Sequence, residues 1–193
     1  SKPVVVSFIA IPGCIDLAVR GNILYADLTT DLVAIDITNP QSVKLTKVLE
    51  GVFPHRYYAG YFMNDTNRVI VDWLRVDTVT WSSEPLSWGL KSADMVSFSS
   101  SSTANKSSNG TGGSMARFAL YDDRLYTVSH SDLKVFNTAI SAEPTYVKQI
   151  DLNSGDIETI FPYGNNLFLG SQTGMYIFSV QQKDNPVKQS MFT

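Results

Sequence analysis

The sequence predicts an all-β protein, a β-propeller made of four-stranded antiparallel blades. Each copy of an internal repeat reads as four short alternating runs separated by turn residues, and no helical stripe interrupts them. Blades of this kind repeat every 40 to 45 residues or so and stack around an axis, because one blade cannot bury both of its faces alone. A step of 42 positions separates three pairs of similar residues: Tyr126 and Phe168, Leu133 and Met175, and Phe136 and Phe178.

The chain opens with Pro3–Ala10, a run rich in β-branched and aromatic side chains that suit a pleated, buried surface. Its Pro-Val start recurs at Pro186-Val187, in the last strand of the final copy. We therefore expect Pro3–Ala10 to be the fourth strand of a repeat whose earlier strands are absent.

The first complete copy runs from about Ile15 to Pro54. Gly21-Asn22 is a two-residue turn signal, and Asn39-Pro40 ends a strand because proline cannot donate to a central ladder. The copy is thus predicted to be a four-stranded meander with short connections. Its expected strands are Ile15–Val19, Ile23–Asp27, Leu32–Ile37 and Val43–Leu49.

The second copy, Phe53–Val96, keeps the pattern in a distorted form, with strands expected at Arg68–Trp73 and Val76–Trp81. Residues 97–114 consist almost entirely of Ser, Thr, Asn and Gly, which cannot bury enough apolar surface to become ordered. We interpret this stretch as an exposed loop of the disordered type inserted in the second copy.

The blade count follows from the phase of the repeat at both ends of the chain. Copies three and four are the most regular, and the last residues, 186–193, read as a fourth strand, as Pro3–Ala10 does. Residues 1–193 are therefore expected to form a single domain of about four blades plus one extra strand. Because both ends have the same phase, we expect this domain to be part of a larger propeller.

Composition excludes several classes of function. Fifteen Lys and Arg against 18 Asp and Glu, with no basic block, give no electrostatic footprint for nucleic acid. No apolar run approaches the roughly 20 residues of a transmembrane helix. A single cysteine, Cys14, cannot form an internal disulfide. The stretch from Lys2 to Cys14 has the outline of a lipoprotein signal, but Pro12 and the strand phase favour a structural interpretation.

Several stretches resemble the LVIVD-repeat proteins of the Bacteroidetes group, and Leu32–Asp36 is this chain's version of the motif that names them. The resemblance covers nearly the whole chain. It implies an exported β-propeller lipoprotein, anchored at the outer membrane or cell surface through a cysteine ahead of residue 1 and so not through Cys14. The stretches that carry it include Ile11–Asp16, Gly21–Asp27, Asp31–Ile37, Asp72-Trp73, Gly112–Phe118, Ile157–Pro162 and Leu167–Tyr176.

No catalytic constellation is evident in the sequence. His55 and His130 lie in different copies and in no metal-ligand frame. No Gly-x-Ser-x-Gly elbow occurs, and the glycines at 110–113 are followed by no lysine and no evident helix. We therefore expect a protein that is not an enzyme, with no resident cofactor.

Three acidic residues of the first copy, Asp27, Asp31 and Asp36, lie at strand ends and a corner. Short carboxylates at such places bond to nearby backbone N–H groups, and this is the role we expect for them. The alternative is a Ca²⁺ site, which needs several convergent oxygens that spacing alone cannot demonstrate.

A second set of charged and aromatic residues could line a central channel, because the strand nearest the axis of a propeller presents its end residues there. Charges in such surroundings are costly unless they are paired. We expect Arg117 to pair with Glu158 or with an acid of the second copy, as a structural ion pair or as part of a ligand site. The proposed binding set is Asp72, Trp73, Arg75, Asp77, Arg117 and Glu158, and Thr78, in Asp77-Thr78-Val79, resembles an O-glycosylation acceptor of Bacteroidetes exported proteins.

The function expected from these observations is that of a non-catalytic β-propeller of the cell envelope, a binding or scaffold module for protein or glycan partners. Two alternatives stay open. One is a metal-dependent propeller hydrolase or lyase with its site on the axis, and the other is a structural subunit of an outer-membrane assembly. Fold alone does not separate them.

Overall fold

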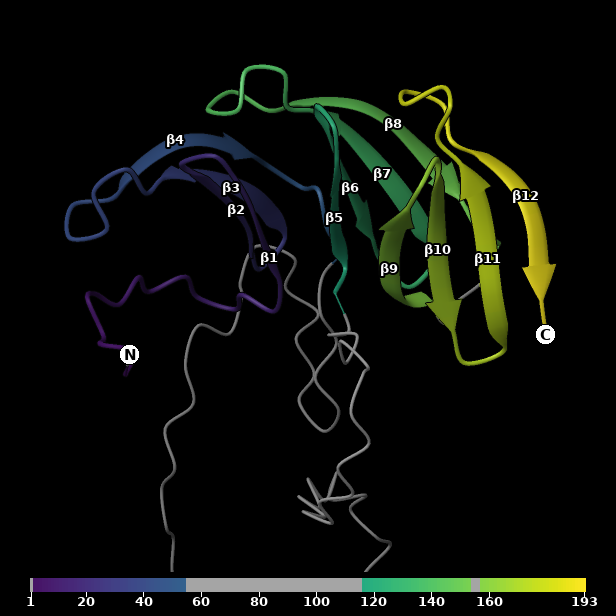
Figure 1. Ribbon diagram of the computed structural model, residues 1–193, viewed down its shortest axis with the longest axis horizontal. Helices are drawn as coiled ribbons and strands as arrows, with labels where there is room; N and C mark the ends of the chain where they lie inside the picture. Colours follow the sequence, from purple (N-terminus) through teal and green to yellow (C-terminus); the bar gives the residue numbers. More distant parts are fainter. Residues whose placement is uncertain (1, 55–115, 154–156) are drawn as a thin grey trace, which may run out of the picture. The chain divides into compact units, whose positions relative to one another are not determined.

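The computed structural model describes residues 2–54, 116–153 and 157–193, and within these ranges the chain is all β, with no helix (Figure 1). The strands form three four-stranded antiparallel sheets. The first sheet contains β1 (Leu17–Arg20), β2 (Ile23–Leu28), β3 (Asp31–Asp36) and β4 (Lys44–Leu49). The second contains β5 (Phe118–Tyr121), β6 (Arg124–Val128), β7 (Asp132–Asn137) and β8 (Thr145–Asp151). The third contains β9 (Ile157–Tyr163), β10 (Asn166–Ser171), β11 (Gly174–Ser179) and β12 (Val187–Phe192).

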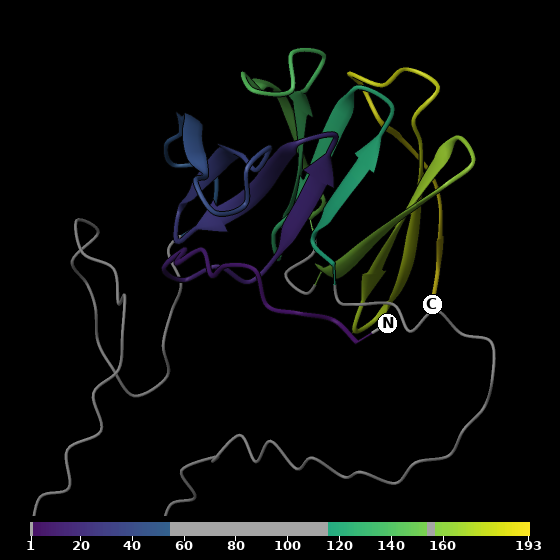
Figure 2. The same ribbon diagram turned by 60° about the vertical axis from the view of Figure 1, so that its left-hand side comes forward.

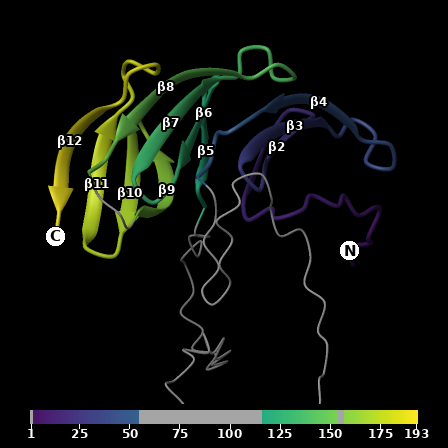
Figure 3. The same cartoon turned by 180° about the vertical axis from the view of Figure 1, so that it is seen from behind.

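Each sheet is a meander, in which strands adjacent in sequence are hydrogen-bonded neighbours (Figure 3). The turn between the first two strands has the same backbone form in all three sheets. Gly21, Asp122 and Gly164 hold φ values of 58°, 50° and 56° there, a left-handed conformation that glycine adopts without steric cost and that aspartate tolerates. The four strands predicted for the first copy are confirmed.

The three sheets share one strand register. Opposite each other on the second and third strands lie Leu24 and Ile35, Leu125 and Phe136, and Leu167 and Phe178. The pairing register between the third and fourth strands shifts at a β-bulge, and the shift occurs at the same place in each sheet. It lies between Ala34 and Ile35, Val135 and Phe136, and Ile177 and Phe178. A bulge increases the local twist of a strand, so the three outer strands are bent in the same way.

The two faces of each sheet are named here after residues of its second strand. The tyrosine face carries Tyr25, Tyr126 or Phe168, and the leucine face carries Leu24, Leu125 or Leu167. Opposite faces arise because successive side chains of a strand point to opposite sides.

Sheets pack tyrosine face to leucine face, twice in succession. Tyr25 and Leu32 of the first sheet form one apolar cluster with Leu125 and Phe136 of the second. Tyr126, Val135 and other tyrosine-face residues of the second sheet form another cluster with Leu167 and Phe178 of the third. The first strands follow the same order, since β1 contacts β5 and β5 contacts β9 (Figure 2).

The first sheet packs directly on the second through their shared apolar cluster. At this contact Phe53 stacks on Phe118, with ring centroids 5.7 Å apart. The strands expected at 68–73 and 76–81 and the loop expected at 97–114 fall outside the described residues.

The expected strand at Pro3–Ala10 is wrong, because residues 2–10 carry no strand. Val4, Val5 and Phe8 are 82%, 89% and 89% exposed. A fourth strand needs a third strand to pair with, and all four positions of the first sheet are filled by β1–β4. Ile9, near the end of the segment, and Ile11, just after it, lie against the leucine face of the first sheet.

Candidate functional site

Buried tyrosines join neighbouring sheets at equivalent places. The Tyr25 hydroxyl donates to the Ser141 carbonyl at 2.8 Å, and the Tyr126 hydroxyl donates to the Lys183 carbonyl at 2.9 Å. Ser141 and Lys183 are one repeat step of 42 positions apart. Burial raises the pKa of both phenols above the ordinary value. The equivalent residue in the third sheet, Phe168, has no hydroxyl to donate.

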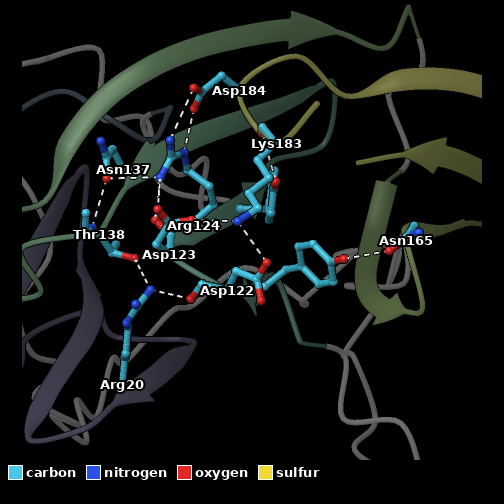
Figure 4. A network of polar contacts seen from close by, with 12 residues as sticks. Arg20, Asp122, Asp123, Arg124, Asn137, Thr138, Asn165, Lys183 and Asp184 are labelled. Atoms are coloured by element: carbon cyan, nitrogen blue, oxygen red, sulfur yellow. Dashed lines mark hydrogen bonds and ion pairs between the residues drawn. The ribbon is translucent and has the colours of Figure 1, made fainter. Parts of the chain in front are cut away.

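A polar network joins the sheets at the end where the first two strands turn (Figure 4). Arg20, at the end of β1, donates to the Asp122 carbonyl and, at 3.0 Å, to the hydroxyl of the buried Thr138. Tyr121 occupies the equivalent position in the second sheet, and its hydroxyl donates to Asn165 Oδ1 at 2.8 Å. In both cases the last residue of a first strand reaches the corresponding turn of the next sheet.

Arg124 is the centre of the network between the second and third sheets. Its guanidinium makes a bidentate pair with Asp184, with Nε–Oδ1 at 2.5 Å and Nη2–Oδ2 at 3.2 Å. Nη1 also lies 2.9 Å from Asp123 Oδ2 and donates to Asn137 Oδ1 at 3.1 Å. The hydrogen bonds that Arg124 donates to Asp184 lower the pKa of the Asp184 carboxyl and raise the pKa of the Arg124 guanidinium.

Lys183 completes the network from the β11–β12 connection. Its ammonium lies 2.9 Å from Asp122 Oδ2 and 3.2 Å from Asp123 Oδ1. The hydrogen bond from Lys183 lowers the pKa of Asp123, and the one to Asp122 raises the pKa of Lys183. Each of these charges is matched by an opposite charge of the same chain, so the arrangement is suited to holding sheets together.

The sequence analysis did not single out this network. The sequence shows that Arg20, Tyr121 and Tyr163 occupy equivalent positions, at the ends of the first strands of their copies and just before a turn. Spacing within one copy could not show which turn of the next copy each side chain would reach.

At the opposite end of the strands, carboxylates bind backbone N–H groups. Asp16 Oδ2 accepts the N–H groups of Arg117 and Phe118, which start the second sheet. Asp27 Oδ1 accepts those of Ile15 and Asp16, both at 2.9 Å. Asp16 therefore ties the first sheet to the second, and Asp27 holds the backbone of Asp16 in place.

The expected corner role of the first-copy acids is confirmed by their hydrogen bonds. Besides Asp27, Asp31 Oδ1 accepts the Gly51 N–H at 2.9 Å and Asp36 Oδ1 accepts the Thr38 N–H at 2.8 Å. Asn137 repeats the Asp36 bond with the Ala139 N–H at 2.9 Å. In the described ranges no three His, Cys, Asp or Glu side chains gather as metal ligands would, and the Ca²⁺ alternative stays a prediction.

The proposed channel-lining set is described only at two of its positions. Arg117 and Glu158 are both half-buried, at the beginnings of neighbouring first strands. Glu158 Oε1 accepts a hydrogen bond from Gln172 Nε2 at 2.9 Å, and the described ion pairs do not join it to Arg117. A ligand role for the set and modification of Thr78 stay predictions. Outside the described residues lie Asp72, Trp73, Arg75, Asp77, Thr78 and His55.

The third sheet carries an open apolar surface on its tyrosine face. Phe161 and Tyr163 of β9 are 61% and 71% exposed, and Phe168 and Met175 lie beside them in a shallow hollow of about 400 Å³. Equivalent positions in the second sheet, such as Ala119 and Leu133, are buried against the third. The 42-residue step in the sequence already pairs Phe168 with Tyr126, and so places Phe168 on this face of its sheet.

Comparison with models of known protein families gives no match, and a search of curated proteins gives none. The resemblance to LVIVD-repeat proteins therefore stays a prediction. Among the described residues, no helix has the length and apolar character needed to cross a membrane.

Proposed function

We propose that this chain is part of a β-propeller that serves as a non-catalytic binding or scaffold module of the cell envelope. Three meanders with one topology, joined by the same face-to-face packing twice, support the propeller assignment. The succession of contacts from β1 to β5 to β9 supports it further, because the first strands of blades surround the propeller axis. Rings have about four to eight blades, so the proposal requires sheets beyond the three described.

The observation that carries the binding role is the open tyrosine face of the third sheet. Exposed aromatic side chains that lie together mark interaction surfaces more often than single exposed apolar residues do. Of the residues that line the hollow, only Thr159 and Tyr163 have a side-chain hydroxyl. Glycans need many hydrogen bonds as well as stacking, so this surface favours a protein partner over a glycan.

The test is affinity capture from envelope extracts of a Bacteroidetes host with three immobilised proteins. These are the wild type, the double variant Phe161→Ser/Tyr163→Ser, and Ile140→Asp as a matched control. Ile140 is 67% exposed in the connection between β7 and β8, away from the open face. A partner retained by the wild type and the control but lost from the double variant supports the proposal. Equal retention by all three proteins contradicts it.

A further inference from the structure

The open tyrosine face of the third sheet has the same character as the two faces that already join sheets. In the second sheet the tyrosine-face residues of β5, Ala119 and Tyr121, pack against the third sheet. The residues one repeat step later are Phe161 and Tyr163, which are 61% and 71% exposed. A surface built like two established interfaces is therefore left uncovered by the described residues.

A matching surface lies at the other end of the series of sheets, on the leucine face of β1. Leu17 and Val19 are 55% and 48% exposed. The equivalents of Leu17 in the next two sheets, Phe118 and Ile160, are only 7% and 2% exposed because a tyrosine face covers them. The leucine faces of the second and third sheets are thus occupied within the chain, while that of the first sheet is exposed along β1.

The turn of the first sheet suits the open face as well. Tyr121 donates to Asn165 in the turn of the sheet that covers it. Tyr163 holds the position of Tyr121, and Asn22 holds the position of Asn165. The preceding residues, Gly21 and Gly164, have φ values of 58° and 56°, so both turns present asparagine on the same backbone form.

We propose that a second copy of this chain covers the open face, with the leucine face of its first sheet on the tyrosine face of the third. The proposal rests on the proposed function, in which this face binds a protein, and it identifies that protein. Phe161 and Tyr163 of one copy pack on Leu17 and Val19 of the other, and Tyr163 donates to Asn22. Because the two surfaces differ, the association is head-to-tail, and it closes into a ring or extends as a filament.

The contact centres on β1. Ile9 and Ile11 already pack over Leu24 and Val33 of the leucine face, whereas Leu17 and Val19 stay exposed. Contacts between first strands are also those that join neighbouring sheets within the chain. Docking through β1 therefore leaves the packing of Ile9 and Ile11 in place.

The test is sedimentation equilibrium of the full chain between about 1 and 100 µM, with one charged variant for each surface. Phe161→Asp damages the third sheet's surface, and Leu17→Asp damages that of the first. Both residues are more than half exposed, and circular dichroism with thermal unfolding checks that each variant folds. Ile140→Asp is the matched control.

The expected result is concentration-dependent association of the wild type and of Ile140→Asp, and roughly tenfold or greater weakening for each surface variant alone. An equimolar mixture of the two variants regains a one-to-one dimer, because each supplies the surface that the other lacks. A wild type that stays monomeric at every concentration overturns the inference. So does association that Leu17→Asp leaves intact and Phe161→Asp abolishes, which indicates two open faces packed on each other. A monomer that still captures a different protein through Phe161 and Tyr163 overturns this inference and leaves the proposed function standing.

Discussion

The carboxylate of Asp16 accepts the backbone N–H of Phe118 at 2.9 Å, although 102 positions separate the two residues in sequence. The same oxygen accepts the Arg117 N–H. One side chain of the first sheet thereby satisfies two donors at the start of the second. Hydrogen bonds to a charged acceptor are stronger than those between neutral groups.

Replacement of Asp16 by alanine is expected to destabilise the fold by about 1 to 3 kcal/mol, because two N–H groups lose their acceptor. Asp16→Asn keeps an oxygen at the same place and is expected to lose less. Urea unfolding of the two variants measures the difference. Equal losses for alanine and asparagine would show that the carboxylate oxygen is not what joins the sheets.

The Tyr126→Phe variant is expected to lose about 0.5 to 1.5 kcal/mol, since it removes the hydrogen bond to the Lys183 carbonyl and leaves the ring in place. Tyr25→Phe removes the equivalent bond to Ser141 and should cost a similar amount. Chemical unfolding of both variants tests whether the two interfaces are alike in energy as well as in geometry. A loss at one site only would contradict that equivalence.

Alkaline pH should weaken the fold through the same phenols. Burial raises the pKa of Tyr25 and Tyr126 in the folded state, whereas an unfolded tyrosine ionises near pH 10 or so. The contribution of these two phenols to the free energy of unfolding is complete below that pH. It is lost as the pH rises, because the tyrosines of the unfolded chain release their protons first. Stability measured from about pH 9 to 11 should fall less steeply in Tyr126→Phe than in the wild type. If the stability of the two proteins fell equally with pH, Tyr126 would not be a source of the alkaline weakening.

Acid should weaken the junction between the second and third sheets. The pairing with Arg124 lowers the pKa of Asp184, so its contribution is present above the unfolded pKa, near 4 or so, and is lost as the pH falls through the folded value. Asp184→Asn should reduce the acid dependence and cost at most about 1 kcal/mol at pH 7, because Asp184 is 57% exposed. Glu143→Gln, at an exposed position in the β7–β8 connection, is the control. If the stability of Asp184→Asn falls at low pH as steeply as that of the wild type, the prediction is wrong.

The pairing of adjacent strands could be predicted because it is local. Leu24 and Ile35, or Leu167 and Phe178, are partners within one hairpin, and alternation together with turn residues determines such pairs. The role of Asp36 was predictable for the same reason, since its carboxylate accepts the N–H of Thr38, two positions later. Asp31 also bonds to backbone, as predicted, but its partner, Gly51, is 20 positions away.

Contacts between copies could not be derived in this way. Arg124 and Asp184 are 60 positions apart, and nothing in either turn shows that the two turns meet. Pro3–Ala10 has the composition of a strand, but none of the described strands pairs with it, so its composition was misleading. The packing of the first sheet on the second depends on which faces meet across a long intervening segment, and periodicity carries no information about that.

The stacking of Phe53 on Phe118 has a consequence for folding. The two rings bracket residues 54–117, so the first sheet can join the second only after this whole segment has been closed into a loop. The entropic cost of closure grows slowly with length, and a short Gly/Ser linker in place of residues 56–114 should lower it by about 1 kcal/mol or more. The second and third sheets, which follow each other directly in sequence, are expected to associate first. Stopped-flow refolding should then show the shortened chain folding faster at the step in which the first sheet docks, with the earlier step unchanged.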